Sequence, residues 1–166
     1  MRERTLVLLR HSKADRPSSV ADIDRPLTAR GHADAAAAGV WLAHHGHRPD
    51  LVICSPSKRT RQTWHGVSVA LAEGPAPKVR YDEVVYDGDA AELLKLTRTA
   101  GDKVRTVLMI GHNPSISWLS ALLDPSAGGD SDGLRTSGLA VHRLTGKWSE
   151  LRAGDTKVTG THTARG

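Results

Sequence analysis

The sequence has 166 residues, which is enough for one compact domain with a sizeable core. Hydrophobic residues make up 39% and charged residues 25%, close to the usage of ordinary globular proteins, and this excludes a disordered or fibrous chain. The net charge of +5 fits an anionic substrate or nucleic acid. The basic residues are scattered, however, and four Trp and two Tyr offer few platforms for bases, so we expect no nucleic-acid partner.

Cysteine usage and hydropathy favour a cytoplasmic protein. Cys54 is the only cysteine and cannot form an internal disulfide, which is typical of a reducing compartment. The apolar run at residues 5–9 is too short for a signal peptide, and no stretch approaches the roughly 20 apolar residues of a membrane span. We therefore expect no membrane partner.

Three short apolar runs predict strands. They cover residues 5–9 (TLVLL), 51–54 (LVIC) and 106–110 (TVLMI). Continuous apolar runs of this length are typical of strands that are covered on both faces in a parallel sheet.

Helical segments lie between these runs. Residues 28–45 have Thr28 as a plausible N-cap, and residues 89–99 open with Asp89 and Glu92 at the spacing of a capping box. Alternating strands and helices predict an α/β fold with a mainly parallel sheet.

At two places the sequence predicts that a strand leads directly into a helix, because a residue that caps helices well is followed by proline. Ser55 precedes Pro56, and Asn113 precedes Pro114, which would then be the first residue of each helix. Backbone N–H groups and the positive end of the helix dipole gather at such junctions, so both are natural anion sites.

The C-terminal part predicts less structure. Residues 139–144 and 148–151 favour a closing hairpin, and the polar segment from Thr156 onward is expected to fray. We expect a single domain over residues 1–155 and a flexible tail over residues 156–166.

Charged side chains follow the ends of all three predicted strands. Arg10 and His11 follow the first, Arg59 comes shortly after the second, and His112 follows the third. Ligands of open α/β sheets lie beyond the carboxyl ends of the strands, so these side chains are expected to meet there. Two imidazoles, two guanidiniums and two helix N-termini fit a phosphate.

The residue types at this edge suit phosphoryl transfer, which requires mainly positioning and positive charge. Arg10 and Arg59 can hold phosphate oxygens bidentately, whereas Arg61 points about 200° away from Arg59 around a helix. A neutral imidazole is a competent nucleophile toward phosphorus, a role that His11 can fill. His112 can then stabilise the transition state.

The ordered motifs resemble the histidine phosphatase superfamily, which includes phosphoglycerate mutases. Residues 9–13 (LRHSK) resemble its RH signature, residues 55–63 (SPSKRTRQT) its second arginine motif, and residues 111–114 (GHNP) its second-histidine motif. The RHSK start, residues 24–28 (DRPLT) with Gly31, and the short chain are most similar to the small bacterial phosphohistidine phosphatases.

This resemblance implies a three-layer α/β/α sandwich of the phosphoglycerate mutase type and assigns roles to residues. It implies His11 as the phosphorylated nucleophile and His112 as the second histidine. It implies four phosphate-binding residues besides His112, namely Arg10, Arg25, Arg59 and Asn113. Glu83 is the nearest candidate for a general acid, and no metal or cofactor is expected.

Two other groups of reactive residues allow a different interpretation. His44, His45 and His47 could form a metal cluster, although a helix end without carboxylates favours solvated side chains. Cys54 precedes arginines, but a cysteine phosphatase needs five residues between Cys and Arg, and neither Arg59 nor Arg61 has that spacing. A buried strand end is the simpler interpretation of Cys54.

The sequence therefore predicts a metal-independent phosphatase. The leading hypothesis is hydrolysis of protein phosphohistidine, with a phosphorylated protein or a small phosphorylated compound as the partner. A broad-specificity phosphomonoesterase and a non-catalytic phosphate-binding module remain the alternatives.

Overall fold

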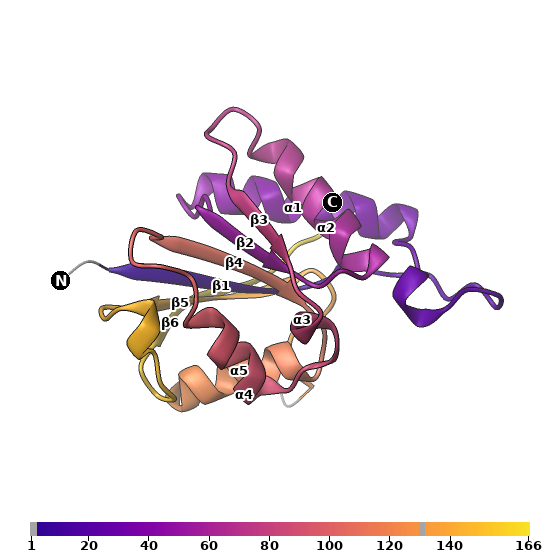
Figure 1. The fold of residues 1–166 in the computed structure, drawn as a ribbon. Helices are drawn as coiled ribbons and strands as arrows, with labels where there is room; N and C mark the ends of the chain where they lie inside the picture. Colours follow the sequence, from indigo (N-terminus) through magenta and orange to yellow (C-terminus); the bar gives the residue numbers. More distant parts are fainter. Residues whose placement is uncertain (1–2, 130–131) are drawn as a thin grey trace.

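The protein is built on one mixed sheet, described by a computed structural model for residues 3–129 and 132–166. In these residues the sheet has the strand order β3-β2-β4-β1-β5-β6 (Figure 1). The strands are β1 (Arg4–Arg10), β2 (Leu51–Cys54), β3 (Lys78–Tyr81), β4 (Thr106–Gly111), β5 (Gly138–Leu144) and β6 (Lys157–Thr163). The strands from β3 to β1 run parallel, and β5 is antiparallel to both of its neighbours.

Helices cover both faces of the sheet. They are α1 (Ala29–His44), α2 (Lys58–Ala70), α3 (Val84–Asp87), α4 (Ala90–Thr97) and α5 (Ser115–Leu123), with short 3₁₀ turns η1 (Asp22–Asp24), η2 (Pro125–Ala127) and η3 (Trp148–Glu150). Figure 1 shows α1 and α2 on one side of the sheet and α4 and α5 on the other. The predicted three-layer α/β/α sandwich with a mainly parallel sheet is confirmed.

The central strand β1 explains why the predicted strands are apolar throughout. Leu6 and Leu8 pack into the core beneath α4 and α5, whereas Val7 and Leu9 pack into the core beneath α1 and α2. All four side chains are fully buried. Each contributes roughly 2 kcal/mol of hydrophobic stabilisation, so β1 is held firmly in the middle of the sheet.

The predicted helix caps are confirmed at two helices. The Thr28 hydroxyl accepts a hydrogen bond from the Gly31 N–H at the start of α1 (3.0 Å). At the start of α4, Asp89 and Glu92 form the reciprocal capping box that their spacing predicts.

The predicted caps at the other two junctions are wrong. Helix α2 begins at Lys58 with Ser57 as its N-cap, and α5 begins at Ser115 after Pro114. Ser55 instead makes a hydrogen bond with His112, and Asn113 makes one with Leu134. These side chains are therefore not free to cap a helix.

The prediction for the C-terminal part is also wrong. Residues 148–150 form the turn η3, and the hairpin partner of β5 is β6, paired from Gly138 opposite Thr163. The segment expected to be a frayed tail is therefore an edge strand. Most of its side chains are polar and all are at least partly exposed, so the strand is held mainly by backbone pairing with β5, which leaves no apolar pattern in the sequence.

No helix in the described parts of the chain combines the length and the apolar character that a bilayer crossing demands.

Candidate active site

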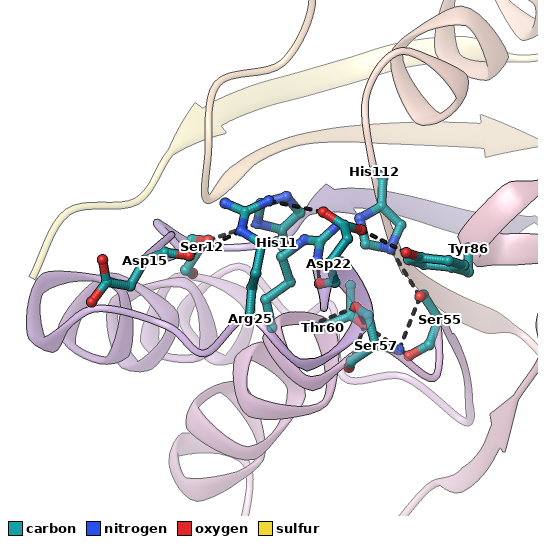
Figure 2. Close-up of polar contacts among 11 residues, drawn as sticks. His11, Ser12, Asp15, Asp22, Arg25, Ser55, Ser57, Thr60, Tyr86 and His112 are labelled. Carbon is teal, nitrogen blue, oxygen red and sulfur yellow. Dashed lines mark hydrogen bonds and ion pairs between the residues drawn. The ribbon is translucent and has the colours of Figure 1, made fainter. Parts of the chain in front are cut away.

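The parallel pairing of the strands brings the two histidines together. Arg10 at the end of β1 lies opposite Gly111 at the end of β4, so His11 and His112 are the next residues beyond neighbouring strand ends. Their ring centroids are 5.3 Å apart. Cys54 of β2 pairs with Ile110 in the same way, which places Ser55 beside His112. Figure 2 shows the side chains of His11, Ser55 and His112 close together beyond these strand ends.

His11 is buried with one ring nitrogen already engaged. Its Nδ1 lies 2.7 Å from the carbonyl oxygen of Ser12, which can only accept, so Nδ1 carries the proton and Nε2 keeps a free lone pair. Burial, together with the positive charges of Arg59 and Arg10 and against the opposing effect of the Ser12 bond, lowers the pKa of His11 to about 4. The imidazole is therefore neutral at physiological pH.

His112 is oriented by Ser55 and by an aromatic neighbour. Its Nε2 lies 2.8 Å from Ser55 Oγ. The rings of Tyr86 and His112 are packed edge to face, with their centroids 5.4 Å apart. Burial, then the proximity of His11 and Arg59, lowers the pKa of His112 to about 3. An anion at the site would favour the tautomer with the proton on Nδ1 and Ser55 donating to Nε2.

Three buried nitrogen atoms at the site have no hydrogen-bond partner among the described residues. They are Arg10 Nε, Arg59 Nε and His112 Nδ1. Buried donors are almost always paired in folded proteins, and an unpaired one costs about 1–3 kcal/mol. Three of them in one place indicate a site whose natural occupant is an oxygen-rich anion.

The two arginines reach this site from different elements. Arg59 lies in the first turn of α2 and is 6% exposed, whereas Arg61 is exposed and donates to the Pro56 carbonyl (3.0 Å). Arg59 therefore reaches the site and Arg61 does not, while the phosphate contact of Arg59 stays a prediction. Arg10 is fixed by a bond from Nη1 to the Leu134 carbonyl (3.1 Å), and burial lowers its pKa.

Arg25 lies at the margin of the site. Its Nε donates to the Asp15 carbonyl at 2.9 Å, and its Nη1 makes an ion pair with Asp22 at 3.2 Å. Its positive charge is one of those that lower the pKa of His11. The structure therefore places Arg25 beside Asp22 and near His11, and its phosphate contact stays a prediction.

Asp22 and Tyr86 also lie at the site, although neither is predicted from the sequence. The Asp22 carboxylate accepts hydrogen bonds from Tyr86 Oη (2.6 Å) and Arg59 Nη2 (3.1 Å) in addition to its ion pair with Arg25. These partners, the Tyr86 bond first, hold the pKa of the Asp22 carboxyl well below its usual range. The one sequence feature that could have indicated Asp22 is its position three residues before Arg25. No sequence feature indicated Tyr86.

Two predicted site residues have other surroundings. The Asn113 amide donates to the Leu134 carbonyl (2.7 Å) and accepts from the Ser117 hydroxyl, so both of its ends are occupied within the protein. This does not fit the predicted phosphate contact. Glu83 is exposed just before α3, and within the described chain its side chain makes no hydrogen bond or ion pair. Nothing ties it to the imidazoles.

The alternative reactive groups also find structural explanations. His45 stacks on Trp41 at 4.0 Å between ring centroids, and His47 lies beside the same ring. No group of three His, Cys, Asp or Glu side chains in the described residues is arranged to hold a metal ion. Cys54 is fully buried, and burial raises the pKa of its thiol to about 12, which fits a strand end rather than a nucleophile.

The charges of the site leave a positive excess. Of the site residues described above, the guanidiniums of Arg10, Arg25 and Arg59 are positive and the carboxylate of Asp22 is negative, while both imidazoles are neutral. A phosphoryl group with two negative charges would balance this excess.

The sheet topology and the buried histidine among arginines define a phosphatase of the histidine type. The chain belongs to the histidine phosphatase superfamily (branch 1), whose family model matches residues 6–86. The match runs from β1 through α2 to Tyr86. The third motif, around His112, lies outside that range and joins the site through the pairing of β4 with β1.

Similarity to related proteins extends over nearly the whole chain. The chain is 35% identical over 164 residues to the uncharacterized protein Rv1276c of Mycobacterium tuberculosis, covering 95% of this chain and 100% of the relative. It is 34% identical, with a TM-score of 0.85, to a candidate phosphohistidine phosphatase SixA from Nakamurella multipartitia, covering 98% and 96% of the two chains. A protein histidine phosphatase SixA solved with tungstate is 25% identical with a TM-score of 0.75, covering 96% of each chain.

Proposed function

We propose that this protein is a phosphohistidine phosphatase that hydrolyses protein phosphohistidine through a phosphorylated intermediate on His11. One observation carries the proposal. The free Nε2 lone pair of a neutral, buried imidazole lies among three buried nitrogens that lack partners in the described structure. A phosphoryl group fills this arrangement, because it offers oxygen acceptors to the donors and an electrophilic centre to the lone pair.

The reaction follows from these groups. His11 Nε2 attacks phosphorus, a new P–N bond forms, and the bond to the substrate's leaving group breaks with its electron pair. Arg10, Arg59 and His112 hold the phosphoryl oxygens and balance their charge, which is the main requirement of phosphoryl transfer. Water then attacks phosphorus, the P–N bond breaks with its electron pair returning to His11 Nε2, and phosphate leaves carrying the protons of the water. The guanidiniums supply the charge that a metal ion supplies in other enzymes, so the proposed reaction is metal-independent.

The lack of an evident proton donor among the described residues of the site favours a phosphohistidine substrate. An alkoxide leaving group requires a general acid, whereas an imidazole departs readily as a neutral base. Glu83 makes no contact that ties it to the histidines in the described structure, and the low pKa of Asp22 keeps that carboxyl ionised. Similarity to proteins named as phosphohistidine phosphatases points to the same substrate. A buried single thiol is compatible with action in the cytoplasm.

The deciding experiment pairs a substrate panel with His11→Ala. The panel contains a phosphohistidine carrier protein and small sugar and nucleotide phosphates. We expect turnover of the phosphohistidine protein, an acid-labile and base-stable phosphoenzyme in rapid-quench samples, and loss of both in the variant. Robust turnover of the small esters alone would establish the broad-specificity phosphomonoesterase instead. Binding of phosphate without any turnover would establish the non-catalytic module.

A further inference from the structure

The Asp22 carboxylate occupies an unusual place for an acidic group in an anion site. Arg59 donates to Asp22 twice, from Nη1 to its carbonyl oxygen (2.7 Å) and from Nη2 to its carboxylate (3.1 Å). Tyr86 and Arg25 hold the same carboxylate from α3 and from the loop that carries η1. Three contacts to the carboxylate and one to the backbone carbonyl therefore fix a negative charge beside the groups that are expected to bind phosphate (Figure 2).

This carboxylate lies on the solvent side of the site. His11 is 7% exposed, whereas the side chain of Asp22 is 53% exposed. In phosphoryl transfer the attacking and leaving atoms lie roughly in line on opposite sides of phosphorus. In the proposed reaction His11 attacks from the protein interior, so the leaving group departs toward solvent. The exposed carboxylate of Asp22 lies on that side.

We infer that Asp22 recognises the leaving group, by accepting a hydrogen bond from the ring N–H of a phosphorylated imidazole. This inference rests on the proposed function and names the residue that selects its substrate. The substrate is then a phosphoimidazolium, phosphorylated on one ring nitrogen and protonated on the other. Asp22 favours this protonated form by pairing with it.

The chemistry balances without a proton transfer. The bond between phosphorus and the substrate nitrogen breaks, and its electron pair stays on that nitrogen. The positive charge of the ring is thereby neutralised, and the departing imidazole keeps the proton on its other nitrogen, still facing Asp22. At the same time His11 Nε2 forms the new bond to phosphorus. No group has to deliver a proton, which is consistent with an Asp22 carboxyl held in its ionised form.

The same carboxylate discriminates against esters. An ionised carboxyl cannot protonate a departing alkoxide, and it offers no favourable contact to a leaving group without an N–H. Selectivity then comes from one residue on η1, while the oxygens of the phosphoryl group are held by Arg10, Arg59 and His112 in both cases. Asp22 therefore sets the preference between substrates, and its removal should be visible in their ratio.

The test is Asp22→Asn with a matched control. Asp24→Asn changes another carboxylate of η1, an exposed one that makes no side-chain hydrogen bond or ion pair with other described residues. The probes are a peptide carrying 3-phosphohistidine and p-nitrophenyl phosphate, whose leaving group has no N–H and needs no proton. We expect the ratio of kcat/KM for the peptide over the ester to fall at least tenfold in Asp22→Asn and to stay within twofold in Asp24→Asn.

Other outcomes overturn the inference. An equal fall for both probes would make Asp22 a group that only orients Arg59. An equal rise, together with tighter binding of tungstate, would make it an anion that only competes with phosphate. Thermal melting of each variant confirms the fold, and Asp22→Ala provides a second measure of the same ratio. The proposed function fails differently, when the wild type is phosphorylated on His11 by the ester but does not turn over the peptide.

Discussion

The side chains of Ser55 and His112 are joined by a hydrogen bond of 2.8 Å between Oγ and Nε2, which connects the ends of β2 and β4. Ser55 Oγ also accepts from the N–H of Ser57 (3.2 Å), so the residues before α2 fix the position of this hydroxyl. The imidazole of His112 is thus aimed by the turn that leads into α2, where Arg59 lies.

Removing this bond should slow catalysis with little change in the fold. In Ser55→Ala the His112 ring loses the contact that fixes its angle and tautomer, and we expect kcat to fall about 10- to 100-fold because small misplacements of reacting groups are costly. Steady-state kinetics and thermal melting measure the two effects. Ser68→Ala, which removes a hydroxyl bonded to His65 on α2, is the control. Equal kinetics in both variants would show that Ser55 does not orient His112.

The guanidinium shape of Arg59 should matter as well as its charge. In the wild type, the planar guanidinium of Arg59 donates to Asp22 from both Nη atoms, and its Nε stays available for phosphate. Arg59→Lys keeps the positive charge but loses this geometry. We expect kcat/KM to fall by about 100-fold or more. Arg61→Lys, a change on the exposed face of the same helix, should alter kcat/KM less than twofold. A fully active Arg59→Lys enzyme would remove Arg59 from the phosphate site.

Acid should destabilise the protein partly through His142, which is fully buried between Ser120 (2.7 Å to Nε2) and Thr156 (2.7 Å to Nδ1). Burial lowers the pKa of His142 to about 4 in the folded state, while the unfolded state titrates near 6.5. The unfolded state therefore binds more protons in this window. The free energy of unfolding should fall as pH drops from about 6.5 to about 4, with His142 contributing on the order of 1–3 kcal/mol.

Urea unfolding at pH 7.5 and pH 5.0 measures this contribution in wild type and in His142→Gln. His11 and His112 also have lowered pKa values and act in the same direction, so the wild type carries several such contributions. The variant should be less stable at pH 7.5 yet lose less stability on acidification. An identical loss in both proteins would exclude His142 as a source of acid sensitivity.

Gly31 should tolerate no side chain. A Cβ at this position would lie 2.1 Å from the carbonyl oxygen of Lys13, which accepts the Thr28 N–H at the start of α1. Gly31→Ala should therefore push α1 away from the loop that follows His11 and lower the melting temperature by several degrees or more. Gly160→Ala on β6 meets no atom within 4 Å and serves as the control. Equal melting temperatures would show that the loop yields freely.

The predictable part of the fold is the part whose stability comes from apolar side chains. β1, β2 and β4 are buried on both faces, so their continuous runs identify them in the sequence. β3 (KVRY) and β6 (KVTGTHT) are edge strands whose side chains are mostly polar and all at least partly exposed. Their pairing depends on backbone hydrogen bonds to strands that already exist, and no local pattern records such a partner.

The same distinction applies to the site. His11, Arg10, Arg59 and His112 follow strand ends or open a helix, so their meeting can be predicted from the parallel sheet alone. Asp22 reaches the site only because η1 packs beside α2, through contacts that depend on the whole fold. Tyr86 likewise comes from a short helix that no periodicity predicts.

The position of β1 in the sheet also constrains how the protein acquires its activity. The strand that carries His11 pairs with β4 and β5, which end more than 100 residues later in the chain. Because synthesis proceeds at about 5–20 residues per second, several seconds or more pass between the synthesis of β1 and that of β4 or β5. Such long-range pairings also slow folding after release. The nucleophile is thus made early but acquires its surroundings late, when β5 joins the sheet.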